Sequence, residues 1–351
     1  MVAETPPPQA AAAGASSDPT PDPTPAPVAE TLPSATCPLS DHGFGAPPSR
    51  GRISSGWYTR ASDYPEAQRE QEAAAAPMVV YVYTDWCGYC RVFERDLLSS
   101  VAVDSYLRDG AVKVRINPET DSSAGVLARE LGAQGFPSFF IATPRGAPEK
   151  VSLYRARTQL KSPEEFIEGI EERMKRQAQV LLALGAQQRQ SRNARDAVAT
   201  LTQAVRIVPE SPRAYRERAW AFLENGDPEK ALDDLARGAR LPPGGLEFFR
   251  DAESLLARQQ RWDEAIACWT SFLDSNASSG TAYLARARIL ARRGAPGLSG
   301  ADLQKACALG EAQACRSIPA ASMDGQDRTG GSDVRSARVK VRRVAAGEPF
   351  R

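Results

Sequence analysis

The sequence lacks an excess of charge of either sign, a long apolar run and a recognisable secretory signal. Its 44 basic residues stand against 43 acidic ones, so the overall charge does not indicate nucleic acid or an anionic membrane as a partner. It contains no stretch of about 18 or more apolar residues, and we therefore expect no transmembrane segment. Residues 1–41 consist mainly of alanine, proline, threonine and serine, without the charged and then apolar order of a signal peptide.

Histidine is almost absent, and its single occurrence, His42, lies in a proline-rich leader (residues 1–51). That leader has too few large apolar side chains to fold and is expected to be disordered. Cysteine is sparse as well: six residues in a chain long enough for two domains do not make a disulfide scaffold. A zinc site at Cys87 and Cys90 would need a second pair of ligands, which the sequence does not offer. We therefore expect no metal at this pair and favour redox chemistry. Cys37 is interpreted as a stray thiol, and the remaining cysteines are Cys268, Cys307 and Cys315.

The segment Trp86-Cys87-Gly88-Tyr89-Cys90 follows an apolar run, residues 78–83, and precedes a helix-like stretch. Two cysteines spaced i, i+3 at such a junction place the first sulfur at a helix N-terminus. There the helix dipole and the free backbone N–H groups favour the nucleophilic thiolate. The second sulfur follows one turn later, close enough to form a disulfide with the first. This pattern predicts a redox-active dithiol with no further cofactor, in which Cys87 is the exposed nucleophile and Cys90 the more buried resolving cysteine.

Residues 52–176 alternate between strand and helix patterns, which predicts an α/β domain with one central sheet. The last helix begins at Ser162, where a capping serine is followed by Pro163 and by two glutamates. The other expected elements are helices over 62–76, 87–107 and 122–131 and strands over 78–84, 111–116, 138–141 and 151–154.

From about residue 178 the sequence becomes rich in alanine and leucine and repeats with a period of 34 residues. Small residues recur where paired helices cross, at Gly185, Ala219 and Ala287, and Glu253 breaks this column. The pattern resembles the tetratricopeptide repeat (TPR), with four units over roughly 178–311 in an array assigned to residues 177–318. It predicts an all-α superhelical solenoid. The two clearest columns are Ala197, Ala231, Ala265, Ser299 and Leu201, Leu235, Trp269, Leu303.

The first domain resembles the thioredoxin superfamily in the strand over 78–84, in the WCGYC motif at 86–90, and in Gly135-Phe136-Pro137 before a later strand. The resemblance implies that the peptide bond before Pro137 is cis and faces the dithiol. It also implies that residues around the pair support it or contact substrate, namely Trp86, Gly88, Tyr89, Phe136 and Pro137.

The sequence departs from the thioredoxin pattern at two places. Tyr81 stands where the family has a buried acid. Lys113 aligns with the family's lysine near that acid, and without the acid the resemblance assigns Lys113 no role. Gly-Tyr also replaces the Gly-Pro of cytoplasmic thioredoxins between the two cysteines. The direction of electron flow is therefore left open between reduction, oxidation and isomerisation.

The groove positions of the TPR family imply a basic inner surface, because arginines outnumber the opposing Glu224 and Glu247. Such a surface suits an acidic peptide or a C-terminal carboxylate. The alternative is that these arginines are ordinary solvated helix residues. The asparagines of the chaperone-tail clamp are absent, which disfavours a chaperone adaptor. The implied groove arginines are Arg189, Arg213, Arg216, Arg250, Arg258, Arg288 and Arg292.

Cys307 and Cys315 lie on either side of a glycine-bearing turn in a segment that resembles cysteine-stapled Sel1-like repeats. They are candidates for a structural disulfide, the alternative being two buried cysteines that cap the array. A disulfide here would favour an exported, periplasmic protein, whereas the missing signal, taken literally, favours the cytoplasm. The last segment, residues 319–351, is a glycine- and serine-rich basic tail expected to be disordered.

These features together predict a thiol–disulfide oxidoreductase that acts on protein substrates and exchanges electrons with an upstream thiol partner, with the TPR array recruiting partners. Two other functions stay open. The chain would be a non-catalytic adaptor if the cysteine pair were idle, or a disulfide isomerase or chaperone if it shuffled disulfides.

Overall fold

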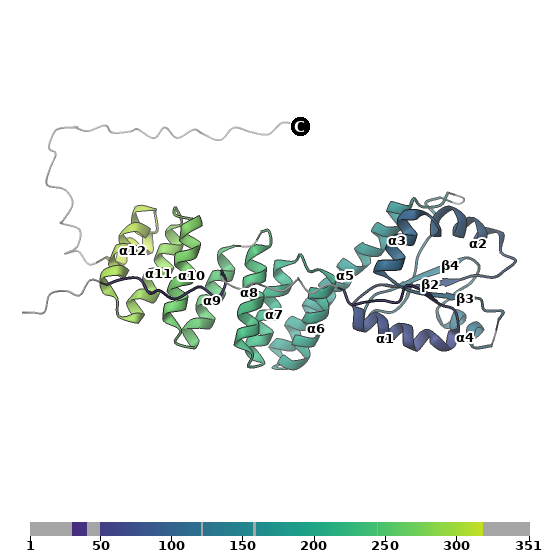
Figure 1. Cartoon of the computed structure of the whole chain (residues 1–351), viewed down its shortest axis with the longest axis horizontal. Helices are drawn as coiled ribbons and strands as arrows, with labels where there is room; N and C mark the ends of the chain where they lie inside the picture. The colour runs from purple at the N-terminus through teal and green to yellow at the C-terminus, as the bar shows by residue number, and fades with distance from the viewer. Residues whose placement is uncertain (1–29, 41–49, 121, 157–158, 244, 319–351) are drawn as a thin grey trace, which may run out of the picture. The chain divides into compact units, whose positions relative to one another are not determined.

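The computed structural model describes residues 30–40, 50–120, 122–156, 159–243 and 245–318. Most of the predicted leader, with His42, and all of the predicted basic tail lie outside these ranges. Within them the chain forms a mixed α/β domain followed by an array of paired helices (Figure 1). No helix in this part of the chain combines the length and the apolar character needed to cross a membrane.

A five-stranded sheet forms the centre of the α/β domain, in the order β1-β3-β2-β4-β5. β3 runs parallel to both β1 and β2, whereas β4 runs antiparallel to β2 and to β5. The predicted α/β architecture with one central sheet is thereby confirmed. The strands are β1 (Trp57–Tyr58), β2 (Met78–Val82), β3 (Val112–Ile116), β4 (Ser138–Ala142) and β5 (Glu149–Lys150).

Helices cover both faces of this sheet, which is why β2 is buried along its whole length (Figure 1). Because side chains alternate along a strand, Met78, Val80 and Val82 pack with residues of the helices α1 and α4. Val79 and Tyr81 pack on the opposite face with residues of α2, α3 and α5. The helices are α1 (Tyr64–Ala74), α2 (Gly88–Phe93), α3 (Val101–Gly110), α4 (Ser122–Glu130) and α5 (Pro163–Gln190), with a 3₁₀ turn at Ala61–Asp63.

Two predicted elements differ from those in the structure. The single helix expected over 87–107 is interrupted: α2 continues as a π-helical turn, Glu94–Leu98, and α3 begins afresh after Ser100, whose hydroxyl accepts from the backbone N–H of Val103. The strand expected over 151–154 is wrong, because the two residues that pair with β4 lie earlier, in β5. Val151 and Leu153 are buried apolar residues beyond the end of β5. Val151 still donates its backbone N–H to the carbonyl of Phe139 in β4 at 2.9 Å, but the pairing does not continue as a strand through 154.

Helix α5 belongs to both halves of the described chain. It opens with a capping box, in which Ser162 and Glu165 satisfy one another's backbone N–H groups. Its first turns place Phe166 and Ile170 in the core of the α/β domain. Its later turns place Met174 and Leu181 in a second core with the next helix. The expected boundary between residues 176 and 177 therefore falls inside one continuous helix.

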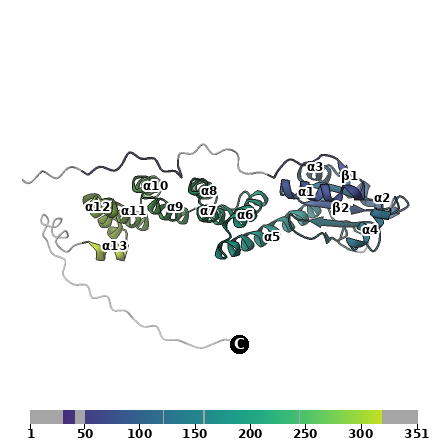
Figure 2. The ribbon, with the colours of Figure 1, turned by 90° about the horizontal axis from the view of Figure 1, so that it is seen from below.

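The array consists of four helix pairs that follow one another in chain order, ending in a short helix (Figure 2). Residues of the predicted columns form its cores: Ala197, Ala231 and Ala265 are buried. Gly185 is required where it stands, because a Cβ there would lie 2.5 Å from the Leu201 side chain. The helices after α5 are α6 (Ala194–Ile207), α7 (Pro212–Glu224), α8 (Pro228–Arg240), α9 (Leu246–Arg258), α10 (Trp262–Ser275), α11 (Gly280–Arg293), α12 (Pro296–Ala308) and α13 (Ala312–Ser317).

The third repeat breaks two columns at once, and the two changes compensate each other. Trp269 takes the position of Leu201 and Leu235 and is completely buried, so its indole N–H needs an acceptor. Glu253 supplies it: the Nε1 of Trp269 donates to Oε2 of Glu253 at 2.9 Å. The glutamate that interrupts the small-residue column is therefore the partner of the tryptophan that interrupts the leucine column. Burial raises the pKa of Glu253, against the opposing effects of the Trp269 hydrogen bond and nearby arginines.

Replacing Glu253 with alanine is expected to lower the free energy of unfolding by about 1–3 kcal/mol, because the buried indole N–H loses its acceptor. The double variant Glu253→Ala/Trp269→Leu recreates the pair that the second repeat has at Ala219 and Leu235. The double variant should lose less free energy of unfolding than the sum of the losses in the two single variants. Urea unfolding followed by circular dichroism measures the coupling. Asp274→Ala, which removes an exposed carboxylate of the same repeat, serves as the control. Strictly additive losses would contradict the compensation.

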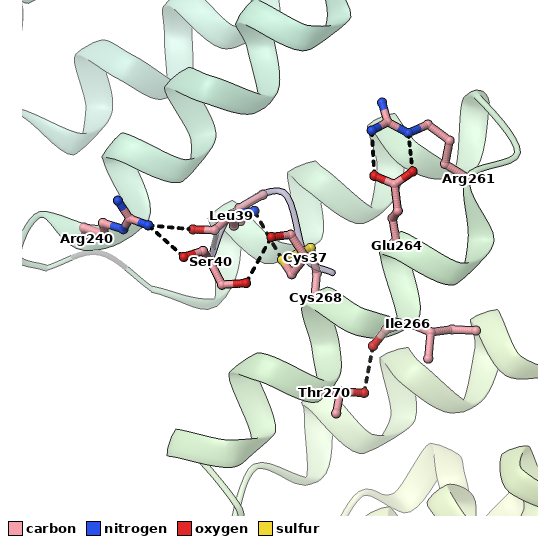
Figure 3. Close-up of a disulfide and its surroundings, with 9 residues drawn as sticks. All are labelled: Cys37, Leu39, Ser40, Arg240, Arg261, Glu264, Ile266, Cys268 and Thr270. Carbon is pink, nitrogen blue, oxygen red and sulfur yellow. Dashed lines mark hydrogen bonds and ion pairs between the residues drawn. A yellow bond between two sulfur atoms is a disulfide. The ribbon is translucent and has the colours of Figure 1, made fainter. Parts of the chain in front are cut away.

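Cys37 is not a stray thiol, and this interpretation of the sequence is wrong: it forms a disulfide with Cys268 of α10, 231 residues later (Figure 3). Both side chains are buried, and the neighbouring Leu39 packs into the core of the second and third repeats. Arg240 at the end of α8 donates to the backbone carbonyls of Leu39 and Ser40, at 3.4 and 3.1 Å (Figure 3). Residues 37–40 are thus fastened to the array by a covalent bond, an apolar side chain and hydrogen bonds.

The position of Cys268 in the repeat explains why this segment binds there. The equivalent residues 34 positions earlier and later are Asp234 and Asp302, and each forms a bidentate ion pair within its own repeat, with Arg218 and Arg286 respectively. The third repeat has Ala252 where those arginines stand. It has no internal ion pair at this position, and the bond to Cys37 takes its place.

Candidate functional site

Cys87 and Cys90 are joined in a disulfide at the junction between β2 and α2. Cys87 is the N-cap residue of α2, and its Sγ accepts from the backbone N–H of Cys90 at 3.0 Å. The helix N-terminus therefore points at the first sulfur, as the motif spacing predicted. The expectation that Cys87 is exposed is wrong for this oxidised form, because only 4% of the residue is accessible. Its sulfur is bonded to Cys90 and directed at the helix end, which leaves little of it uncovered.

Aromatic side chains surround the disulfide and are far more accessible than the sulfurs. Trp86 and Tyr89 are 64% and 67% exposed, among the most exposed large apolar residues of the described chain. Phe136 comes from the loop before β4 and packs edge-on against Trp86, with ring centroids 6.0 Å apart. The Phe136–Pro137 peptide bond is cis, as the resemblance implied. The structure thus brings the 86–90 segment and the 136–137 segment together into one aromatic surface, in which Trp86 and Tyr89 are exposed and Phe136 is half-buried.

Residues after β3 hold the loop that precedes Cys87, and sequence reasoning missed them. The Nδ2 of the buried Asn117 donates to Oδ2 of Asp85 at 3.1 Å. The indole N–H of Trp86 donates to the Glu119 carboxylate at 3.0 and 3.2 Å. The only sequence signal for them is their place just beyond the carboxyl end of β3, which runs parallel to β2. Such ends meet at the same edge of a sheet.

Tyr81, which replaces the expected acid, is fully buried in the same core as the disulfide and hydrogen-bonded to Glu94 of the π-helical turn. Its hydroxyl donates to Oε1 of Glu94 at 3.1 Å, and burial, reinforced by the Glu94 charge, raises the pKa of Tyr81 far above its usual value. Tyr81 therefore stays neutral at physiological pH. The thioredoxin pattern has a carboxylate on the strand at the position of Tyr81. Here the carboxylate that contacts this position belongs to Glu94, seven residues after Cys87.

The burial of the Lys113 side chain is explained by backbone hydrogen bonds and needs no acidic partner. Its ammonium group donates to the backbone carbonyls of Ser54, Leu107 and Ala111 at 2.9 to 3.1 Å. Burial lowers the pKa of Lys113, while these carbonyls satisfy all three of its donors. The side chain ties the segment before β1 to the end of α3. Throughout the described ranges, no group of three or more potential metal-ligating side chains is brought together.

Comparison with known proteins assigns both parts of the chain. A thioredoxin-like family model matches residues 57–144, which include strands β1 to β4, the Cys87–Cys90 disulfide and the cis proline. A tetratricopeptide repeat model matches residues 181–245 and 254–314. A thioredoxin-like domain is followed by a TPR array.

Individual relatives cover only portions of the chain. The thiol:disulfide interchange protein DsbD of Yersinia enterocolitica is 28% identical over 117 residues, which make up 32% of this chain and 20% of DsbD. Tetratricopeptide repeat protein 36 of Caenorhabditis briggsae is 42% identical over 52 residues, 15% of this chain and 29% of that protein. The solution structure of a thioredoxin from Thermus thermophilus is 26% identical with a TM-score of 0.27, covering 34% of this chain and 87% of that one. The chain thus spans about a fifth of the length of the DsbD that it matches.

Cys307 of α12 and Cys315 of α13 are joined in a disulfide. Their Cα atoms lie 4.7 Å apart, within the range that the turn between them was expected to allow. The bond closes a short loop containing the turn at Gly310, which has a positive φ of 92°. All six cysteines of the chain are therefore paired.

Proposed function

We propose that the thioredoxin-like domain is a thiol–disulfide oxidoreductase that acts on protein substrates, and that the TPR array recruits its partners. The observation that carries the proposal is the position of the Cys87 sulfur, which caps α2 and accepts a backbone N–H. In the reduced protein the same N–H groups and the helix dipole stabilise a thiolate at Cys87, because both favour negative charge there. A structural disulfide has no need of this arrangement.

The exchange proceeds in two balanced steps. The Cys87 thiolate attacks one sulfur of a substrate disulfide, forming the Cys87–substrate bond and releasing the other substrate sulfur as a thiolate. The Cys90 thiolate then attacks Cys87, forming the Cys87–Cys90 disulfide and releasing the second substrate sulfur. Two electrons pass to the substrate, which is reduced while the dithiol is oxidised. An upstream thiol partner returns the pair to its reduced form by the same steps in reverse order.

Substrate recognition is assigned to the aromatic surface formed by the exposed Trp86 and Tyr89 and the half-buried Phe136. These rings offer a large contact area beside the sulfurs, and aromatic residues of this kind anchor protein interfaces. Gly88, between the two cysteines, faces open space, since a Cβ there would have no neighbouring heavy atom within 4 Å. Pro137 presents no backbone N–H, so a peptide approaching this side meets only its carbonyl.

Two observations support an exchange role in an oxidising compartment such as the periplasm. The thioredoxin-like domain is related to a protein named for thiol:disulfide interchange. Two further disulfides, Cys37–Cys268 and Cys307–Cys315, lie far from the first in the sequence and have no part in its chemistry. Disulfides of this kind persist outside the reducing cytosol.

Capture of the mixed disulfide tests the proposal. Without Cys90 the intermediate has no resolving thiol, so substrates should accumulate on Cys87 as reductant-sensitive adducts. A non-catalytic adaptor would instead bind its partners equally well with and without Cys87, and would form no adducts.

A further inference from the structure

The seven arginines that the sequence placed in the TPR groove divide into two groups. Arg189 forms ion pairs with Glu217 and Glu224 at 2.8 and 2.9 Å, and Arg216 pairs with Asp251. These intramolecular pairs neutralise two of the three arginines in the first half of the groove, and the third, Arg213, is exposed and forms no ion pair among the described residues. In the second half, four arginines of α9 and α11 have no described acidic residue within ion-pair distance, whereas the α11 residues Arg286 and Arg293 pair with Asp302 and Asp263. The four are Arg250, Arg258, Arg288 and Arg292.

All four of these arginines line one cavity of about 730 Å³ between α9 and α11. Trp262 at the start of α10 forms part of its wall. Glu311 and Gln313 form another part, and they lie in the loop that the Cys307–Cys315 disulfide closes. The volume lies within the range of natural ligand pockets. Arginines from the first helices of two consecutive repeats therefore line one walled space, and the guanidinium of Arg258 also lies over the Trp220 ring.

The two glutamates of the cavity are each held by a neutral partner. Glu253 accepts from the buried indole N–H of Trp269 at 2.9 Å. Glu311 accepts from the hydroxyl of Thr281. Neither carboxylate forms an ion pair with the four arginines among the described residues. The cavity thus keeps an excess of positive charge, with donors suited to bidentate binding of carboxylates.

We propose that this cavity is the recruiting site of the TPR array and that it binds an acidic segment of a partner protein. The proposal rests on the recruiting role proposed above and adds its location and its chemistry. Side-chain carboxylates of the segment pair with Arg288 and Arg292 on α11 and with Arg250 and Arg258 on α9. The indole of Trp262 contacts the apolar parts of the same segment.

Fluorescence anisotropy of a labelled hexaglutamate peptide with the full chain tests the site. We expect saturable binding that weakens as salt is raised, and no binding of the matched hexaglutamine peptide. The double variant Arg288→Gln/Arg292→Gln should weaken binding by about 10- to 100-fold, since two charge-assisted contacts are lost. Arg213→Gln removes an exposed arginine that lies outside the cavity and should leave the affinity within about twofold.

Three results would overturn the proposal: no binding of hexaglutamate, equal binding of hexaglutamine, or equal loss in the Arg213 variant and the cavity variant. Stronger binding of tripolyphosphate than of hexaglutamate, measured by competition, would overturn the choice of an acidic peptide in favour of a phosphate polyanion. The Cys87→Ser/Cys90→Ser variant should bind the peptide with unchanged affinity. Peptide binding is therefore expected even if the chain does not exchange disulfides. Disulfide exchange at Cys87 and Cys90 is likewise expected even if the cavity does not bind an acidic peptide.

Discussion

Cys90→Ala is expected to accumulate mixed disulfides with protein substrates, whereas the native chain should show almost none. In the native protein the Cys90 sulfur lies one helical turn from Cys87 and resolves each adduct as it forms. Its effective concentration at that point is far above that of any thiol in solution, which makes resolution the fast step. Alanine removes the sulfur and leaves only a small void in the surrounding core, so the fold and the Cys87 environment are retained.

The measurement is affinity purification of the variant from the soluble proteins of a bacterial envelope fraction, followed by electrophoresis with and without reductant. We expect bands of higher mass that vanish on reduction and whose tryptic peptides contain Cys87. The matched control is Cys87→Ser/Cys90→Ala, which should lose every band. Bands that persist in this control, or an absence of adducts in Cys90→Ala, would contradict the assignment of Cys87 as the nucleophile.

Removal of the Cys37–Cys268 disulfide is expected to destabilise the TPR array more than removal of any other disulfide. The bond closes a loop of 231 residues, against 8 for Cys307–Cys315. In the chain-entropy account these loops correspond to about 5 and about 2.5 kcal/mol respectively. Residues 37–40 would also lose their anchor, which exposes the buried Leu39.

Guanidinium unfolding of Cys37→Ala/Cys268→Ala, with Cys307→Ala/Cys315→Ala as the matched pair, measures this difference. The chain has several cooperative units and five tryptophans, of which Trp57 and Trp86 lie in the thioredoxin-like domain. With these two replaced by phenylalanine in every variant, tryptophan fluorescence reports on the TPR array through Trp220, Trp262 and Trp269. We expect the midpoint of that transition to fall most in the Cys37/Cys268 variant. An equal or larger shift in the Cys307/Cys315 variant would show that residues 37–40 contribute little to the array.

Much of the fold followed from local pattern. The period of 34 residues predicted the helix pairs and their buried alanine columns, because every repeat buries the same positions against its neighbours. The spacing of Cys87 and Cys90 after an apolar run predicted a disulfide-forming pair at a helix N-terminus. Both features depend on residues close together in the sequence.

Long-range pairing was not predictable in the same way. The partner of Cys37 lies 231 residues away, and a proline-rich leader gave no reason to expect it to be buried. The repeat alignment does hold a signal in hindsight, since Cys268 stands where the neighbouring repeats have a buried aspartate. Glu253 and Trp269 carry a similar signal: each breaks a column, and they lie 16 residues apart, like the Arg218–Asp234 pair.

The groove arginines show what sequence alone does not reveal about a site. Family positions placed all seven on one surface, but they did not show which of them are already paired. The carboxylates that neutralise Arg189 and Arg216 come from the following helix pair, so their contacts depend on how the repeats stack. Glu94 is a comparable case in the thioredoxin-like domain, because the π-helical turn that carries it was not predicted.

Turnover of a protein disulfide is the most direct test of the central claim. Reduction of insulin by limiting dithiothreitol, followed as turbidity, should be accelerated by catalytic amounts of the chain and of the Cys37→Ala/Cys268→Ala variant. The same assay with Cys87→Ser should return to the uncatalysed rate. A native rate equal to background, or acceleration that survives the loss of Cys87, would contradict a thiol–disulfide oxidoreductase centred on Cys87 and Cys90.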